Sequence, residues 1–141
     1  MIEIIFTYEC EGISLDYDHE EFYPEVPPYG GYPLSPEKIE EDVREIVRAY
    51  RNIKGTQKSD VKIGVYTASD IVILFFRLLV LEGKLSNDEV LFVSKNSKGK
   101  YTYYPLDLDA TAQGFRGGME ERFKLSRRLV ELRKKLERNL T

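Results

Sequence analysis

A long apolar stretch in the middle of the chain, residues 61–93, constrains the fold more than any other feature. Val61–Tyr66 predicts a strand, because apolar and β-branched residues follow one another there. A helix over Ile71–Leu81 and a second strand over Val90–Ser94 follow. Alternation of strand and helix is typical of an α/β domain whose strands run parallel.

The helix over Ile71–Leu81 is apolar on nearly every side. Asp70 and Arg77 are its only charged positions before the last turn, so we expect the rest of the fold to cover it on several sides. A membrane span needs about 20 residues, whereas this run has 11 with Arg77 in the middle. The sequence therefore predicts a helix buried in a sheet protein, with no membrane association.

The first half of the chain predicts a strand, an insert and a helix within one domain over residues 1–141. Ile2–Thr7 is rich in isoleucine and predicts a buried strand. Residues 8–34 contain several prolines and glycines, so we expect an irregular insert there. Ser35 is a suitable cap for the helix that follows. Apolar residues lie on one face of that helix: Ile39, Val43, Ile46, Val47, Tyr50 and Ile53.

The second half predicts a hairpin and a long helix. Val90–Ser94 and Tyr101–Leu106 flank the turn sequence Asn96–Gly99, which indicates an antiparallel hairpin. We expect it at the edge of a mainly parallel sheet of four or five strands flanked by helices. Residues 119–140 predict a long C-terminal helix with one apolar side, which lies on the domain surface or against a partner. That side carries Met119, Phe123, Leu125, Leu129, Leu132, Leu136 and Leu140.

Composition sets broader limits. The chain is 42% hydrophobic and 32% charged, as expected for a globular protein, and abundant Lys, Glu and Arg with little Gln are typical of a thermophile. Cys10 is the only cysteine, so no internal disulfide is possible. The N-terminus lacks the basic start of a signal peptide, and we expect a cytoplasmic protein. Residues 1–45 have a net charge of −11 and residues 46–141 of +8, which favours attraction within the fold or contact with a partner.

Three phrases in the middle of the chain form a further pattern. They are Thr67-Ala68-Ser69 after a strand, Glu82-Gly83-Lys84-Leu85-Ser86-Asn87-Asp88-Glu89-Val90, and Leu106-Asp107-Leu108-Asp109 followed by Gly114-Phe115. Together they resemble the C-terminal lobe of ABC-like ATPases of the overcoming-lysogenization-defect and DNA-repair type. The resemblance covers about residues 35–118. It implies an α/β lobe and a protein partner, either a full-length ATPase or a second copy of the chain.

The departures from that family concern its catalytic parts. No GxxxxGK[ST] phosphate loop and no LSGG-type signature occur, and Tyr8 and Glu9 stand where the family has paired acids. Ala68 stands in place of the histidine that senses the γ-phosphate. The resemblance therefore implies a degenerate lobe, that is, a non-enzymatic accessory or protein-interaction domain without a cofactor.

Acidic residues offer an enzymatic alternative. Asp107 and Asp109 together with Glu9 or Glu11 would make a set of the kind that holds metal in Toprim-like nucleases. This requires the carboxylates to lie close together. A second set of possible metal ligands falls in the acidic insert, where a solvated loop is the alternative: Asp16, Asp18 and His19.

Two groups of residues are candidates for binding macromolecules. Tyrosine is favoured at protein interfaces, and three tyrosines lie in the hairpin: Tyr101, Tyr103 and Tyr104. We expect Tyr101 and Tyr103 on one face of the sheet and Tyr104 on the other. The C-terminal helix carries Arg127, Arg128 and Lys134, which suit contact with a partner or with nucleic acid.

Overall fold

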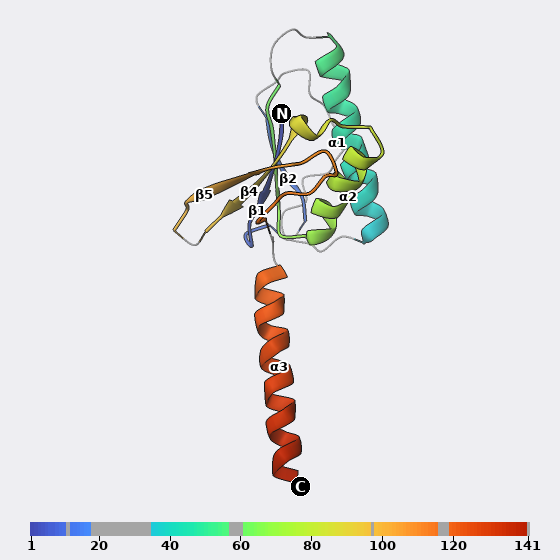
Figure 1. The fold of residues 1–141 in the computed structure, drawn as a ribbon. Coiled ribbons are helices and arrows are strands. Elements are labelled where there is room, and N and C mark those ends of the chain that lie inside the picture. Colours follow the sequence, from blue (N-terminus) through green and yellow to red (C-terminus); the bar gives the residue numbers. More distant parts are fainter. Residues whose placement is uncertain (11, 18–34, 57–60, 97, 116–118, 141) are drawn as a thin grey trace.

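Five strands and three α-helices form the described part of the computed structural model (Figure 1). The structure describes residues 1–10, 12–17, 35–56, 61–96, 98–115 and 119–140. The elements in chain order are β1 (Ile2–Phe6), β2 (Ser14–Tyr17), α1 (Pro36–Thr56), β3 (Ile63–Thr67), α2 (Asp70–Leu81), a short 3₁₀ turn (Asn87–Glu89), β4 (Val90–Lys95), β5 (Tyr101–Pro105) and α3 (Met119–Leu140).

The sheet has the strand order β2-β3-β1-β4-β5. Strands β3, β1 and β4 run parallel in the centre, and β2 and β5 pair antiparallel at the two edges. The α/β class and the edge hairpin β4–β5 are therefore confirmed. The expectation of a mainly parallel sheet is only partly right, because both outer strands are antiparallel.

Strand β2 corrects the expectation that residues 8–34 are irregular. Ser14–Tyr17 pairs with β3 along its whole length, from Ser14 opposite Tyr66 to Tyr17 opposite Ile63. Its one apolar aliphatic residue, Leu15, is half-buried against the core. The short strand covers the backbone groups of β3 that an edge would leave without hydrogen bonds. Four residues with a single apolar position gave too weak a pattern to predict it.

Helices α1 and α2 lie on the same side of the sheet (Figure 1). Alternate residues of the strands point toward them, as the strand geometry requires. Ile4, Val65 and Phe92 are fully buried there, as are Val43 and Ile46 of α1 and Phe76 of α2. The segment after β5 covers a further part of the same face, with Leu106 and Ala110 in the core.

The last turns of α1 are joined to the segment that follows α2 by charged groups. The carboxylate of Glu89 lies 2.6 Å from Lys54 Nζ and 3.5 Å from Arg51 Nη2. Arg51 Nε also donates to the carbonyl of Lys84 at 2.8 Å. Ser86 and Glu89 form a capping box around the short 3₁₀ turn.

Helix α2 is covered on several sides, as expected, but it is exposed along its outer side. The exposed fractions range from 37% for Ile71 to 62% for Leu81. The helix is part of the outer layer, so the sheet, α1 and the segment after β5 cover only its inner side and flanks. The outer side carries four apolar residues, here called the α2 stripe: Ile71, Leu74, Leu78 and Leu81.

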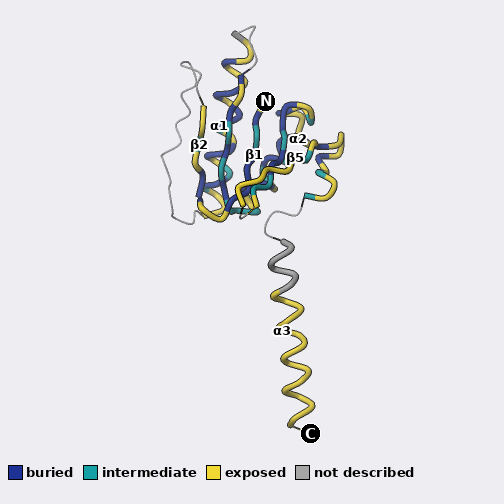
Figure 2. Tube along the Cα trace, turned by 90° about the vertical axis from the view of Figure 1, so that its left-hand side faces the viewer, coloured by how far each residue is buried: buried dark blue, intermediate teal, exposed yellow. Residues whose placement is uncertain are grey.

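Helix α3 extends away from the sheet and the other two helices (Figures 1 and 2). Its bounds agree closely with the predicted helix. Every residue from 125 to 140 is exposed, including the leucines of its apolar side. None of the described helices combines the length and the apolar character that crossing a membrane requires.

Candidate functional site

The turn Thr67-Ala68-Ser69 connects β3 to α2 and is hydrogen-bonded to the segment that follows the neighbouring strand β1. The N–H of Ala68 donates to the carbonyl of Cys10 at 2.6 Å, and the N–H of Thr7 donates to the carbonyl of Thr67 at 2.9 Å. Ser69 lies at the N-cap of α2, but its side chain makes no capping hydrogen bond. Burial raises the pKa of the Cys10 thiol and outweighs the lowering effect of a backbone hydrogen bond. The backbone of the turn is therefore held by hydrogen bonds to the segment that follows β1.

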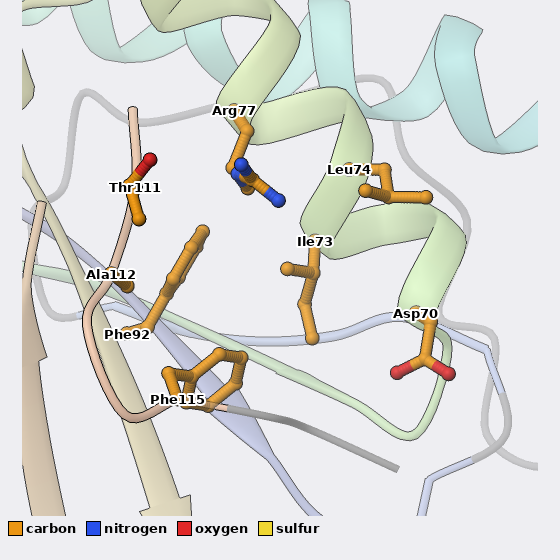
Figure 3. A pocket seen from close by; sticks show the side chains of 8 residues that line it. All are labelled: Asp70, Ile73, Leu74, Arg77, Phe92, Thr111, Ala112 and Phe115. Atoms are coloured by element: carbon orange, nitrogen blue, oxygen red, sulfur yellow. The ribbon is translucent and has the colours of Figure 1, made fainter. Parts of the chain in front are cut away.

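A cavity of about 170 Å³ opens beside α2, between that helix, β4 and the segment after β5 (Figure 3). Two phenylalanines form its floor, with the ring centroids of Phe92 and Phe115 5.1 Å apart. The ring of Tyr104 packs edge-on against that of Phe115, with their centroids 5.3 Å apart. Small-molecule sites have volumes of about 300–1,000 Å³. The size and lining of this cavity suit one apolar side chain of a partner better than a whole ligand.

Two charged residues of α2 stand at the rim of this cavity. Arg77 is held in place by a hydrogen bond of 2.7 Å from its Nε to the carbonyl of Ala110. Figure 3 shows its guanidinium directed toward the cavity, with Asp70 at the opposite end. The two residues are seven positions apart, which places them about two turns apart on one side of the helix. A partner that fills the cavity thus meets one cation and one anion at its margins.

The α2 stripe is continuous with the cavity. Leu74 belongs to both, since it lines the cavity and is 55% exposed. The stripe residues are spaced 3, 4 and 3 positions apart, the spacing with which one helix presents a side to another. The described residues thus provide an apolar track along α2 with a cavity at its side.

Helix α3 carries a second, independent apolar track, here called the α3 stripe. Its residues are spaced 4, 3 and 4 positions apart: Leu125, Leu129, Leu132 and Leu136. Each is between 55% and 61% exposed. Arg127, Arg128 and Lys134 lie on the same helix and are exposed, as the sequence led us to expect.

The structure does not bring Glu9 to Asp107 and Asp109. Glu9 follows the carboxyl end of β1, where Phe6 pairs with Ser94 of β4. Asp107 follows β5, whose last residue pairs with Leu91 near the start of β4. The residues therefore lie at opposite ends of the sheet. Glu11 lies outside the described residues.

The acidic insert is described only at its beginning. Asp16 lies on β2 and is exposed, while Asp18 and His19 fall outside the described residues. Asp16 lines a shallow hollow on the far side of the sheet from the helices, together with Glu3, Lys62 and Tyr66. Among the described side chains, no group of three or more His, Cys, Asp or Glu residues is placed to hold a metal ion.

The hairpin tyrosines divide between the two faces of the sheet as expected. Tyr101 and Tyr103 are exposed, at 41% and 57%, on the face away from the described helices. Tyr104 packs against the core beside Phe115. Two of the three predicted tyrosines are therefore available to a partner.

Tyr66 of β3 lines the hollow that contains Asp16. Burial raises the pKa of Tyr66, and the charge of Asp16 raises it further.

The sequence did not single out the residues of the cavity or the α2 stripe. The helix over Ile71–Leu81 is apolar on all sides, so its pattern cannot tell an inner side from an outer side. In the sequence, Phe115 stands out only as part of the pair Gly114-Phe115. Its role depends on the path of residues 106–115 across the sheet, which no local pattern determines.

Comparison of the chain with protein-family models, with curated proteins and with solved structures found no match in any of the three.

Proposed function

We propose that this chain is a non-enzymatic protein-interaction domain, an accessory protein that binds a protein partner through helix α3. The observation that carries the proposal is the α3 stripe, four leucines along one side of the helix that are each more than half exposed. The proposal also agrees with the resemblance of residues 35–118 to a degenerate ABC-ATPase lobe, whose partner would be a full-length ATPase or a second copy of the chain.

Leaving the leucines of the α3 stripe in water is energetically unfavourable. Complete burial of a leucine side chain contributes about 1.5–3 kcal/mol, and these leucines retain 55–61% of their exposure. A partner that covers all four would gain a substantial part of that energy. Leucines at alternating spacings of 4 and 3 are recognised by another helix through interlocking side chains.

Affinity purification of the tagged chain from its own host tests the proposal. We expect Leu129→Asp/Leu132→Asp to reduce the captured partner by about tenfold or more, because a charge would be buried at the centre of the contact. The matched control Arg127→Gln/Lys134→Gln, on the same helix, should retain it. Capture of the same proteins in equal amounts by all three chains would contradict the proposal.

Binding of nucleic acid through the basic residues of α3 is the contrasting outcome of the same comparison. In that case Arg127→Gln/Lys134→Gln would lose binding and the aspartate variant would lose less. The binding would also weaken steeply as salt is added, because counterions are released when lysine and arginine contact phosphate. Nuclease treatment before capture separates direct protein contact from bridging by nucleic acid.

A further inference from the structure

We infer that the partner of the α3 stripe is the α2 stripe of a second copy of this chain, so that two chains exchange their C-terminal helices. This inference rests on the proposed function, since it names the partner for the same helix. It makes the α2 stripe and its cavity one half of an interface and α3 the other half.

The geometry of the two stripes is compatible. Each has four apolar residues, and the first and last lie 10 positions apart on α2 and 11 positions apart on α3. At about 1.5 Å per residue, both stripes are about 15–17 Å long. The cavity beside Leu74 has room for one apolar side chain, which a leucine of α3 would supply. Anchors that enter pockets near the centre of an interface contribute most to binding.

Charge favours the body of the chain over another α3 as the partner. Residues 119–141 carry eight basic and four acidic residues, net +4, whereas residues 1–118 carry 13 basic and 20 acidic residues, net −7. A pair of α3 helices joined through their leucines would place Arg128, Arg133 and Lys135 beside the seam. Among the described side chains these flanking charges are all positive, so two α3 helices would repel each other in either orientation.

Acidic groups stand at both ends of the α2 stripe. Glu82 lies at one end of α2. Arg44 joins it to Glu40 of α1, because Arg44 Nη2 lies 3.1 Å from a carboxylate oxygen of each glutamate. Asp70 lies at the other end of α2. Basic groups also lie there: Arg44 and Arg77 beside the helix, and Arg48, Arg51 and Lys84 around the hollow at its C-terminal end. The opposite charge that α3 can meet is therefore limited to the acids at the two ends of α2.

A second copy, and not the same chain, is the occupant because α3 extends away from its own α2 in the structure (Figure 2). The exchange of one terminal helix between two copies gives a symmetric dimer with two equal contacts. In such a dimer, the α2 stripe and the α3 stripe of each chain are both covered by the other chain.

Complementation between two variants tests this exchange. The first variant is Leu74→Asp/Leu78→Asp on α2 and the second is Leu129→Asp/Leu132→Asp on α3. We expect the wild type to be a dimer by light scattering and each variant alone to raise the dissociation constant by at least about 100-fold. A mixture of the two variants retains one intact contact, so it should form a heterodimer. All four positions are exposed, and if the α2 variant fails to fold, Leu74→Gln/Leu78→Gln replaces it, because glutamine is a good helix former.

Three results would overturn the exchange. A monomeric wild type would exclude it, including the case in which α3 folds back onto its own α2. An α2 variant that remains dimeric would show that α3 pairs with α3. Failure of the mixture to associate would show that the two stripes do not meet. If the exchange fails while Leu129→Asp/Leu132→Asp still loses a partner in the host, the proposed function stands with a different protein as partner; if capture is also unchanged, both fail.

Discussion

Helices α1 and α3 have similar lengths and similar patterns but opposite surroundings. Helix α1 has 21 residues, and its apolar side is buried to 5% exposure or less from Ile39 to Ile53. Helix α3 has 22 residues, and its leucines are at least 55% exposed. Figure 2 shows the contrast directly, since α1 has a buried side and the described part of α3 has none.

This difference shows what amphipathic patterning does and does not determine. A stripe of apolar residues at helical spacing predicts that something will cover it. It does not predict whether the cover comes from the same chain, because that depends on the path of the segments between the elements. The substitutions below therefore separate α1, which is stabilised within the chain, from α3, which we propose is stabilised from outside.

The largest effect is expected for Ile46→Ala in the centre of α1. Ile46 is fully buried, so we expect the free energy of unfolding to fall by about 2–5 kcal/mol through lost burial and a cavity. Leu132→Ala on α3 should cost the domain less than about 0.5 kcal/mol. Any larger loss for Leu132→Ala should grow with protein concentration, as for a group buried only on association. Urea denaturation at several protein concentrations measures both. Equal losses at high dilution would remove the contrast between the helices.

A smaller effect is expected for Glu89→Gln, which tests how α1 is joined to the segment after α2. Burial alone would raise the pKa of Glu89, but hydrogen bonds from Lys54 and Ser86 and the charges of Lys54 and Arg51 lower it below the ordinary value of 4.5. A group whose pKa is lowered in the fold stabilises it above the unfolded pKa, and this contribution is lost as the pH falls through the folded value.

We therefore expect Glu89→Gln to cost about 1.5–3 kcal/mol near pH 7, the range for hydrogen bonds to charged groups. The difference from the wild type should shrink as the pH falls below 4.5. Glu41→Gln is the control on α1, because its pair with Lys38 is exposed and 3.8 Å long, so its effect should stay below about 0.5 kcal/mol. Thermal unfolding as a function of pH measures both, and a loss for Glu89→Gln that does not change with pH would contradict the assignment.

The smallest effects are expected at two glycines near the C-terminal ends of α1 and α2. Gly83 has a φ of +77° after α2, with no atom within 4 Å of an added Cβ, so Gly83→Ala introduces backbone strain alone. We expect a loss of about 1–2 kcal/mol. Gly55, inside the last turn of α1, has equal space and no positive φ. Gly55→Ala should therefore stabilise the fold by about 0.4–1 kcal/mol. The same sign for both substitutions in denaturant unfolding would refute this distinction.

Local patterns were sufficient for most of the fold. The strand Ile2–Phe6, helix α1, the turn into α2, the hairpin and the bounds of α3 all follow from periodicity, glycine and capping residues. Strand β2 could not be predicted because Leu15 is its only residue that packs against the core. Its pairing depends on β3 having an edge without a neighbour, which is a property of the assembled sheet.

The candidate site was less accessible from the sequence. The α3 stripe could be predicted because charged residues surround its leucines. The α2 stripe could not, since Ile71 and Leu78 have the same character as Val72 and Phe76 on the buried side. The separation of Glu9 from Asp107 could not be predicted for a similar reason: the two residues follow strands that end at opposite ends of the sheet, and local patterns do not give the direction of each strand.

Hydrogen exchange of the backbone amides of α1 and α3 at low and high protein concentration tests most directly whether α3 is covered from outside its own domain. Most of the stability of a helix in a protein comes from packing of its apolar face, so an uncovered α3 should exchange rapidly, whereas packed helices exchange through global unfolding. We predict that α1 is equally protected at both concentrations and that the protection of α3 rises with concentration in the wild type but not in Leu129→Asp/Leu132→Asp. Protection of α3 that is the same at every concentration would contradict the contrast between the two helices.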